Sequence, residues 1–437
     1  MRYLADLHVH SRHSRATSVQ CDLEGLAAHA ARKGVRVVGT GDFTHPGWFR
    51  ELSERLEPAE PGLCKIRENP APASFMLTGE IACVYRREGR VRKVHSLVAV
   101  PSLDAAARVN ACLSRVGNIH SDGRPILGLD PRNLLEILLE ADPASVLIPA
   151  HIWTPWFSML GSKSGFDSPL ECFGDLLPHV FAVETGLSSD PPMNWRVPCL
   201  DPLALVSNSD LHSPQNLGRN ANVFFGEPDY FRMFQGLRER DPAVCGGTLD
   251  LFPEEGKYHL DGHRGCGVAL RPSESAALEN LCPVCGKGLT IGVLNRVEEL
   301  ADPARGREPP APKGALPFQP FIPLPELVGE ILDAAPAGEK TARCCGSLIR
   351  HYGTEMQLLF DAPLDDVARN SKVPLLDEAL RRMREGRVFK SGGYDGVYGE
   401  VKVFAKGERE RLLGAINSVV PVGFAPVVPV APPDPLD

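Results

Sequence analysis

The chain has 437 residues, of which 43% are hydrophobic and 23% charged, and its formal net charge is −8. This length suggests two or three domains, and the composition is that of a globular protein rather than a disordered or fibrous one. We find no apolar run of about 18 residues and no signal-peptide pattern, so we expect a cytoplasmic protein without a transmembrane helix. Twelve cysteines in such a chain predict thiols and a metal site rather than disulfides.

The first strand-like stretch, Tyr3–Val9, leads into a His-x-His pair, His8 and His10. Residues at this spacing on a strand face the same side, so His8 and His10 are expected to present their imidazoles together. Imidazole is a common ligand of zinc, iron and manganese. The pair alone is weak support for a metal site, because strands on protein surfaces also carry such pairs by chance.

Residues 1–245 alternate strand-like and helix-like stretches, a pattern that predicts a parallel α/β sheet. The strand-like runs are Tyr3–Val9, Val35–Gly39, Ser74–Thr78, Ser96–Val100, Ser145–Pro149, Ala182–Glu184 and Ala204–Ser207, and the helix-like runs are Leu23–Lys33, Leu103–Val116 and Asn133–Ala141. Functional residues of parallel α/β folds gather at the carboxyl ends of strands. Histidines and acids stand at or beside such ends repeatedly: His8, His10, Asp42, His45, Glu80, His95, His151, Asp210 and His212. We therefore expect them to meet at one rim of a barrel, against the alternative of scattered capping and surface residues.

Six short motifs in this region resemble those of the PHP (polymerase and histidinol phosphatase) family: Asp6–Ser11, Gly39–Asp42, Gly79-Glu80, Val94–Ser96, Pro149–His151 and Ser209–His212. The resemblance implies an α/β fold, a PHP-type distorted barrel of seven β/α units, with two or three divalent metals (Mg, Mn or Zn). It also implies that Glu80 and Asp210 are essential to catalysis, with Glu80 bridging metals. The implied ligands are His8, His10, Glu80, His95, His151, Asp210 and His212. The family often has adjacent Asp and His at its second motif, whereas here they are split, so the third metal's ligand is either Asp42 or His45.

A second metal pattern lies at residues 250–300. Cys282-Pro283-Val284-Cys285-Gly286 is a turn in which two thiolates can share one ion. His263 and Cys266 would complete a structural zinc site, with His259 as the competing fourth ligand. A redox role for the two cysteines would need a thioredoxin-like context, which the neighbouring sequence lacks.

The rest of the chain is predicted to be a proline-rich connector over 302–325, a helical and glycine-rich region over 325–407, and a disordered tail over 419–437. Helical patterns cover Pro325–Ala334, Lys340–His351 and Leu375–Arg387, and the glycine-rich run Ser391–Val401 suggests a hairpin. From Lys340 to Arg411 there are 14 Lys and Arg against 11 Asp and Glu, a net charge of +3. Basic residues beside a Gly/Tyr loop suit phosphate contacts and base stacking, although this segment taken alone is better explained by a solvated helix face and an ordinary turn. The candidate DNA contacts are Arg381, Arg382, Arg384 and Tyr394.

The whole arrangement up to about Gly407 resembles the endonuclease Q family, on Asp6–Ser11, the cysteine module, Arg296–Ala301 and Gly393–Gly396. The resemblance implies an endonuclease that nicks DNA 5′ to deaminated bases (uracil, hypoxanthine, xanthine) and abasic sites. Trp153, Trp156 and Phe157 are candidates for base stacking, or equally for buried packing. Two alternatives are a PHP phosphatase acting on a small phosphomonoester and a scaffold with an inactive barrel. The extra modules disfavour the first, and the nearly full ligand set disfavours the second.

Overall fold

The computed structural model describes residues 1–69 and 71–419, without the side chains of 416–419. Its centre is a sheet of 11 strands, most of them buried, in the order β15-β12-β11-β1-β2-β5-β4-β3, with β6 pairing with β5 and β8, and β7 with β5. The strands are β1 (Arg2–Asp6), β2 (Val35–Gly39), β3 (Leu56–Pro58), β4 (Cys64–Ile66), β5 (Ser74–Arg87), β6 (Arg90–Val100), β7 (Ile126–Leu127), β8 (Val146–Pro149), β11 (Ala221–Phe225), β12 (Cys245–Leu251) and β15 (Phe318–Phe321). A separate parallel pair, β9 (Ala182–Glu184) and β10 (Ala204–Val206), contacts β8 on one side and β12 on the other.

The sheet is mixed, which corrects the expectation of a parallel one. β1, β2 and β5 run parallel, but β6 is antiparallel to β5 and β8, and β11 is antiparallel to β1 and β12. The reason is local. β5 and β6 form one long hairpin around Glu88 and Gly89, which both have positive φ (53° and 75°), as a two-residue hairpin turn requires. Ser74–Thr78 and Ser96–Val100, expected as separate short strands, are therefore the ends of this hairpin that lie away from its turn.

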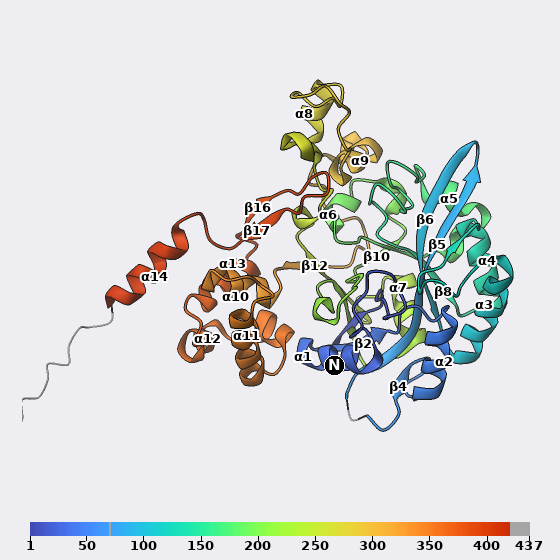
Figure 1. Cartoon of the computed structure of the whole chain (residues 1–437), viewed down its shortest axis with the longest axis horizontal. Helices are drawn as coiled ribbons and strands as arrows, with labels where there is room; N and C mark the ends of the chain where they lie inside the picture. Colours follow the sequence, from blue (N-terminus) through green and yellow to red (C-terminus); the bar gives the residue numbers. More distant parts are fainter. Residues whose placement is uncertain (70, 420–437) are drawn as a thin grey trace, which may run out of the picture.

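Helices of the sheet region begin where side chains satisfy their first backbone amides. Asp22 accepts from the backbone N–H of Gly25 and Ser102 from that of Ala105, which fixes the starts of α1 (Leu23–Lys33) and α3 (Leu103–Val116) at their predicted residues. Asp130 caps α4, whose first turn begins two residues earlier than expected. α3 and α4 cover the outer face of the sheet near β6 and β8 (Figure 1). The helices are α1, α2 (Pro46–Arg55), α3, α4 (Pro131–Ala141), α5 (Pro169–Phe173), α6 (Pro191–Asn194) and α7 (Tyr230–Glu239).

The cysteine module stands above the sheet in Figure 1. It consists of β13 (Asp261–His263), β14 (Val268–Leu270), α8 (Pro272–Ala277) and α9 (Val293–Leu300). Val293 and Val297 of α9 are fully buried in the same hydrophobic cluster as side chains of the sheet region. The module is thus packed onto the sheet region through α9.

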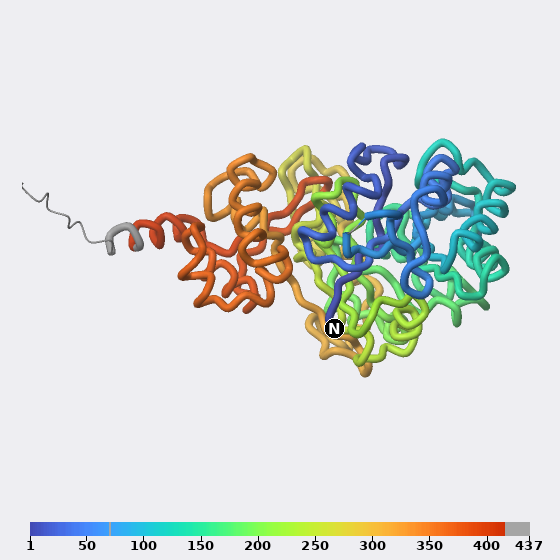
Figure 2. Tube along the Cα trace, turned by 90° about the horizontal axis from the view of Figure 1, so that it is seen from below, coloured from blue at the N-terminus to red at the C-terminus, as the bar shows by residue number. Residues whose placement is uncertain are grey.

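The C-terminal helices form a separate lobe beside the sheet (Figure 2). They are α10 (Leu324–Leu332), α11 (Glu339–Tyr352), α12 (Leu364–Asn370), α13 (Leu376–Arg384) and α14 (Glu408–Val419), with the hairpin strands β16 (Phe389–Ser391) and β17 (Glu400–Lys402). Their core includes Leu4, Val223 and Leu249 from the sheet. The proline-rich stretch is not only a connector, because its residues Phe318–Phe321 pair in parallel with β12.

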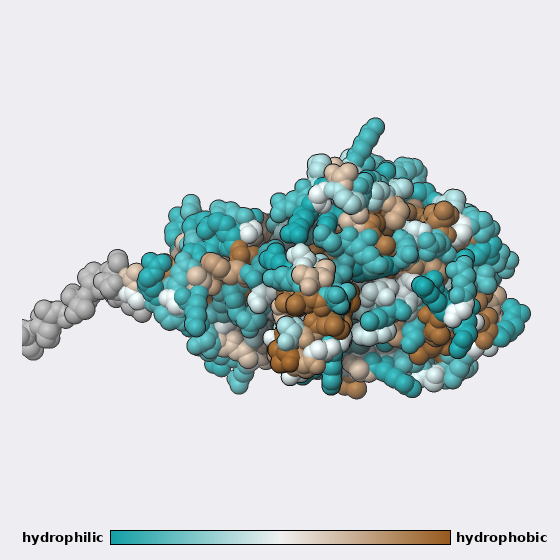
Figure 3. Space-filling view, turned by 90° about the horizontal axis from the view of Figure 1, so that it is seen from above, coloured by the Kyte–Doolittle hydropathy of each residue, from teal (hydrophilic) through white to brown (hydrophobic). Residues whose placement is uncertain are grey.

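The predicted tail falls mostly on residues 420–437, which lie outside the described residues. Among the residues that the structure describes, no helix has the length and apolar character needed to cross a membrane. The face shown in Figure 3 is mainly hydrophilic, with hydrophobic side chains gathered in a central patch.

Candidate metal centre

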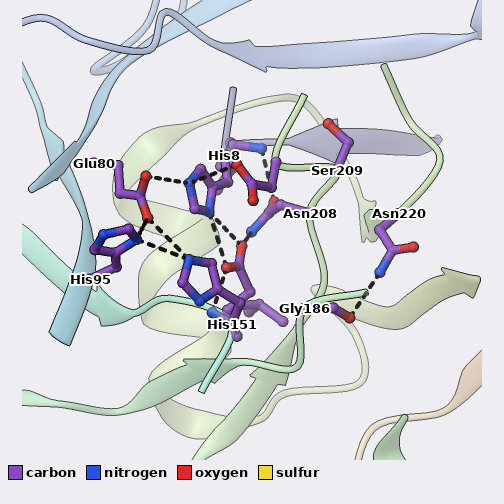
Figure 4. A network of polar contacts seen from close by, with 12 residues as sticks. His8, Glu80, His95, His151, Gly186, Asn208, Ser209 and Asn220 are labelled. Carbon is purple, nitrogen blue, oxygen red and sulfur yellow. Dashed lines mark hydrogen bonds and ion pairs between the residues drawn. The ribbon is translucent and has the colours of Figure 1, made fainter. Parts of the chain in front are cut away.

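Histidine and carboxylate side chains from distant parts of the chain meet at one end of the sheet (Figure 4). His8, His10, Glu80 and Asp210 each bring one ligand atom within 4.8 Å of the others, and Glu80, His95 and His151 do the same. Glu80 belongs to both groups, so its carboxylate lies between them. The two groups are therefore candidate ligand sets for divalent cations.

The donor atoms have the arrangement that a cation needs. Nε2 of His8 is buried and has no hydrogen-bond partner, although it lies 3.6 Å from Glu80 Oε2 and from Asp210 Oδ1. Nε2 of His10 lies 3.3 Å and 3.2 Å from the same two atoms. A buried polar atom without a partner costs free energy, and a cation between these atoms would remove that cost. The residues present therefore fit divalent metals.

The outer nitrogens of the three histidines with inward-facing Nε2 are held by other groups. Nδ1 of His8 lies 3.0 Å from Glu184 Oε2, and Nδ1 of His10 lies 3.1 Å from Asp42 Oδ1. Nδ1 of His151 lies 3.1 Å from Ser158 Oγ, while its Nε2 is 3.1 Å from Glu80 Oε1. Such contacts fix the tautomer and ring orientation of a metal-binding histidine.

Asp42 and His45, the two candidates for a third metal ligand, both have other contacts. Asp42 accepts hydrogen bonds from the Ser11 backbone N–H and from the hydroxyls of Ser11 and Ser14, in addition to orienting His10. His45 caps α2, and its Nε2 lies 3.0 Å from the His120 carbonyl oxygen.

His212, predicted as a ligand, lies at the edge of the centre. Its ring contacts that of His10 at 4.5 Å between centroids, and its Nδ1 lies 3.8 Å from Asp210 Oδ1. The structure therefore brings six of the predicted residues into the two groups and leaves Asp42, His45 and His212 around them.

Charges at the centre compensate one another. Burial alone would lower the pKa of His8, but the carboxylates of Glu184, Glu80 and Asp210 outweigh burial and raise that pKa above its ordinary value. Burial alone would raise the pKa of Asp210, but His8 and His10 hold it below its ordinary value. Burial lowers the pKa of His95 to about 4, which keeps this imidazole neutral and able to ligate a metal. A metal ion would therefore have to displace the proton that the neighbouring carboxylates favour on His8.

Three residues of the centre have backbone conformations that are uncommon outside glycine. Asp42, His151 and Asp210 have φ values of 48°, 32° and 46°. Each follows the end of a strand, where the chain turns sharply and aims the side chain into the centre. Such conformations concentrate at functional sites, because surrounding contacts must hold them in place.

Two residues of the site escaped the sequence argument. Glu184 contacts His8 and also accepts from the His151 backbone N–H and from Asn208 Nδ2, both at 2.8 Å. Its signal was available, because it is an acid at the carboxyl end of a predicted strand. Arg124 lies in a loop, and its Nη1 donates to Glu80 Oε2 at 3.1 Å. No strand-end pattern marks Arg124, so only the folded chain identifies it.

The cysteine module brings together four potential ligands. His263, Cys266, Cys282 and Cys285 each offer an atom within 4.8 Å of the others. The thiols crowd one another: Cys285 first, and then burial, raise the pKa of Cys266 to about 11. His259, the competing fourth ligand, is outside this group. It is buried near the β16–β17 hairpin, and its carbonyl oxygen accepts from the Leu294 backbone N–H. The geometry favours His263.

Comparisons with known proteins agree over nearly the full chain. No family profile matches it. It is 30% identical over 419 residues to the uncharacterised protein YqxK of Bacillus subtilis, covering 91% of this chain and 98% of that protein. Its fold matches the crystal structure of the lesion-specific endonuclease PfuEndoQ from Pyrococcus furiosus with a TM-score of 0.81 and 28% identity, over 96% of this chain and 99% of that one. The chain belongs to the endonuclease Q family. An endonuclease Q complex with a 27-mer duplex carrying an abasic lesion at the active site matches with a TM-score of 0.80 and 28% identity, over 93% of this chain and 98% of that one.

In this member of the endonuclease Q family, the arginines predicted to contact DNA have internal partners. Arg382 bonds to Glu378, Glu408 and the Val403 carbonyl oxygen, and its side chain is only 12% exposed. Arg384 donates to the carbonyl oxygens of Leu358 and Leu359. Arg381 is more exposed but pairs with Glu378 at 2.5 Å. These contacts explain the basic cluster as part of the lobe's own packing.

Some of the aromatic candidates are also internal, whereas one is exposed. Trp153 is buried and donates to Asn194 Oδ1, so it is a packing residue. Phe157 packs against the His95 ring at 4.7 Å between centroids. Trp156, in contrast, is 41% exposed. Tyr394 is half-buried and lies against Gly262 of the cysteine module, so it packs the β16–β17 hairpin against that module.

Proposed function

We propose that this protein is a metal-dependent DNA endonuclease that nicks the strand 5′ to deaminated bases (uracil, hypoxanthine, xanthine) and abasic sites. Its likeness to endonuclease Q structures extends over both the sheet region and the C-terminal lobe, which supports a shared activity rather than a shared catalytic fold alone. The substrate in one of those structures is duplex DNA with an abasic lesion. DNA with damaged bases is accordingly the proposed partner.

The observation that carries the proposal is the pair of ligand groups sharing Glu80, with the unpartnered Nε2 of His8 aimed between carboxylates. Two divalent metals would be held by His8, His10, Glu80, His95, His151 and Asp210, with His212 at the edge. When bound, such ions lower the pKa of a water molecule and neutralise charge on phosphoryl oxygens. A nucleophilic side chain is then not required.

The chain's own residues hold and orient the reacting groups. Glu184, Asp42 and Ser158 fix the histidine rings, as the distances above indicate. Arg124 stands beside Glu80 with its side chain 29% exposed, so its guanidinium can reach both the centre and a bound phosphate. We assign it the role of anchoring the scissile phosphodiester.

The proposal extends to the architecture. We assign residues 1–245 to the catalytic domain, with β9 and β10 bridging β8 and β12 in a distorted PHP barrel. Residues 250–300 form a zinc module with His263, Cys266, Cys282 and Cys285 as ligands of one structural zinc. Residues 325–407 form the C-terminal DNA-binding region.

Cleavage of labelled duplexes tests this function directly. With Mg²⁺ or Mn²⁺, duplexes carrying uracil, hypoxanthine or an abasic site should be nicked once, 5′ to the lesion, leaving a 3′-hydroxyl and a 5′-phosphate. The undamaged duplex and p-nitrophenyl phosphate should be inert. Asp210→Asn should abolish cleavage yet retain DNA binding, while the matched surface variant Asp175→Asn should behave as wild type. Hydrolysis of p-nitrophenyl phosphate without any nicking would instead indicate a phosphatase.

A further inference from the structure

Three segments that are distant in sequence present aromatic side chains at one place. Trp156 belongs to the loop that follows His151, Tyr258 opens the cysteine module, and Tyr398 belongs to the loop of the β16–β17 hairpin. Trp156 is 41% exposed and Tyr398 is 71% exposed. Large aromatic side chains so exposed require an explanation, since burying them would normally stabilise the fold.

Trp156 contacts Tyr258, and one lysine, Lys257, lies near both Tyr258 and Tyr398. The rings of Trp156 and Tyr258 meet edge to face, with centroids 5.9 Å apart and planes at 72°. Nζ of Lys257 lies 5.7 Å from the Tyr258 centroid and 5.9 Å from the Tyr398 centroid. We call Trp156, Lys257, Tyr258 and Tyr398 the aromatic platform. It combines π-faces with a positive charge, as sites for unstacked bases do.

The hairpin holds its part of the platform in place. The Gly396 backbone N–H donates to the Lys257 carbonyl oxygen at 2.9 Å. Asp395 accepts from the Thr290 hydroxyl and from the Arg264 backbone N–H, both at 2.6 Å. Gly396 has φ of 86°, which suits glycine at this turn. The Gly393–Gly396 motif therefore holds the hairpin loop against the cysteine module, and so places Tyr398 near Lys257 without a ligand.

The platform is connected to the metal centre by a single neighbouring residue. Phe157 follows Trp156, packs on the His95 ring, and its carbonyl oxygen accepts from the His95 backbone N–H at 2.9 Å. Phe157 has φ of 62°, so the loop turns sharply between the inward Phe157 and the exposed Trp156. A strand whose phosphate lies at the centre would therefore pass close to Trp156.

We propose that the aromatic platform stacks on the exposed face of a nucleobase next to the lesion, and so contributes to discrimination between damaged and intact duplex. This inference rests on the proposed function. An intact duplex keeps its bases stacked on one another and offers no free face to the platform, whereas a lesion removes that competition. Because stacking depends on an exposed base face rather than on phosphate charge, the platform should affect selectivity and leave the salt dependence of binding unchanged.

Binding of duplexes with 2-aminopurine beside an abasic site tests the proposal, in an Asp210→Asn background that prevents cleavage. In the reference protein, binding should quench the 2-aminopurine by stacking. Trp156→Leu combined with Tyr398→Leu should lose the quenching and weaken binding to the abasic duplex by about tenfold or more. Binding to the intact duplex should change less than about twofold. Trp156→Phe combined with Tyr398→Phe should restore most of the binding, since it returns the aromatic faces.

Phe389→Leu is the matched control, because Phe389 is a 51% exposed aromatic residue on the same hairpin but outside the platform. It should leave binding and quenching unchanged, and thermal melting should show that all variants fold. Equal loss of affinity for abasic and intact duplexes would overturn the proposal, as would full selectivity in the leucine double variant. Wild-type cleavage of the abasic duplex remains the separate test of the proposed function. A wild-type protein with no preference for that duplex would overturn both.

Discussion

At the scale of single residues, the metal centre depends on groups that do not ligate metal. Glu184 contacts His8, His151 and Asn208, and every one of these contacts requires its carboxylate to accept. Replacing a carboxylate that orients a metal-binding histidine commonly costs 10- to 100-fold in metal affinity or activity. Glu184 should therefore matter nearly as much as the ligands.

Glu184→Gln tests this idea while keeping the side-chain volume. We expect metal affinity and lesion cleavage to fall by about 10- to 100-fold, because the amide NH₂ must face groups that donate. Metal titration by calorimetry and cleavage rates at saturating metal measure the two effects. Glu339→Gln, at a fully exposed glutamate, should be neutral. Wild-type metal affinity in Glu184→Gln would mean that His8 is oriented by other contacts.

Asp250 gives a pH dependence of stability that is separate from the metals. Burial raises its pKa to about 7, against which the Thr248 hydroxyl acts only in part. Below about pH 4 the carboxyl is neutral in both the folded and unfolded chain. Between about pH 4 and 7 the unfolded chain releases this proton and the folded chain keeps it, so stability falls as pH rises, by at most about 4 kcal/mol.

Asp250→Asn should remove this loss, since the amide stays neutral. Thermal unfolding at a series of pH values should show the variant gaining on wild type from pH 4 to pH 7 and keeping a constant lead above that. A difference between the two proteins that does not change with pH would show that Asp250 titrates normally.

At the scale of elements, the cysteine module is small and largely exposed, and α9 packs it against the sheet region through buried side chains. Zinc binding would supply much of its folding free energy. The module also carries Lys257 and Tyr258, so its folding and the aromatic platform are linked.

Cys282→Ser should lose the tightly bound zinc and increase hydrogen exchange over residues 257–290. Cys199→Ser, at an exposed cysteine elsewhere, should keep both zinc and protection. His263→Asn should lose zinc and His259→Asn should keep it, because only His263 is in the ligand group. Elemental analysis measures zinc directly, and full retention in Cys282→Ser would refute this ligand set.

At the scale of the whole molecule, a protein of net charge −8 must bind DNA through local features. The basic helix α13 does not supply them freely, because Arg382 bridges α13 to Glu408 of α14 and packs over the Phe404 ring. Its role is to hold the lobe together.

Arg382→Gln should therefore destabilise the C-terminal lobe by about 2 kcal/mol and leave the salt dependence of DNA binding unchanged. Arg411→Gln is the control, since Arg411 is mostly exposed and its Nη2 lies as far as 3.9 Å from Oε1 of the same Glu408. Thermal unfolding and affinities at several salt concentrations distinguish the two roles. If the variant's DNA affinity depends less on salt and its stability is unchanged, Arg382 contacts DNA instead.

The sequence by itself determined features that depend on neighbours along the chain. The starts of α1 and α3 follow from Asp22 and Ser102, which act on amides three residues away. The residues at strand ends could be predicted for the same reason, since a strand and the turn after it are local.

Only the tertiary structure decided which of these residues work together. Glu184 lies 176 residues from His8, and Arg382 lies 26 residues from Glu408, so neither contact leaves a local pattern. The choice of His263 over His259, and of the exposed Tyr398 over the half-buried Tyr394, likewise depended on what packs beside each ring. A side chain's chemistry is written in the sequence, but its partner is set by how distant elements pack, and function depends on the partner.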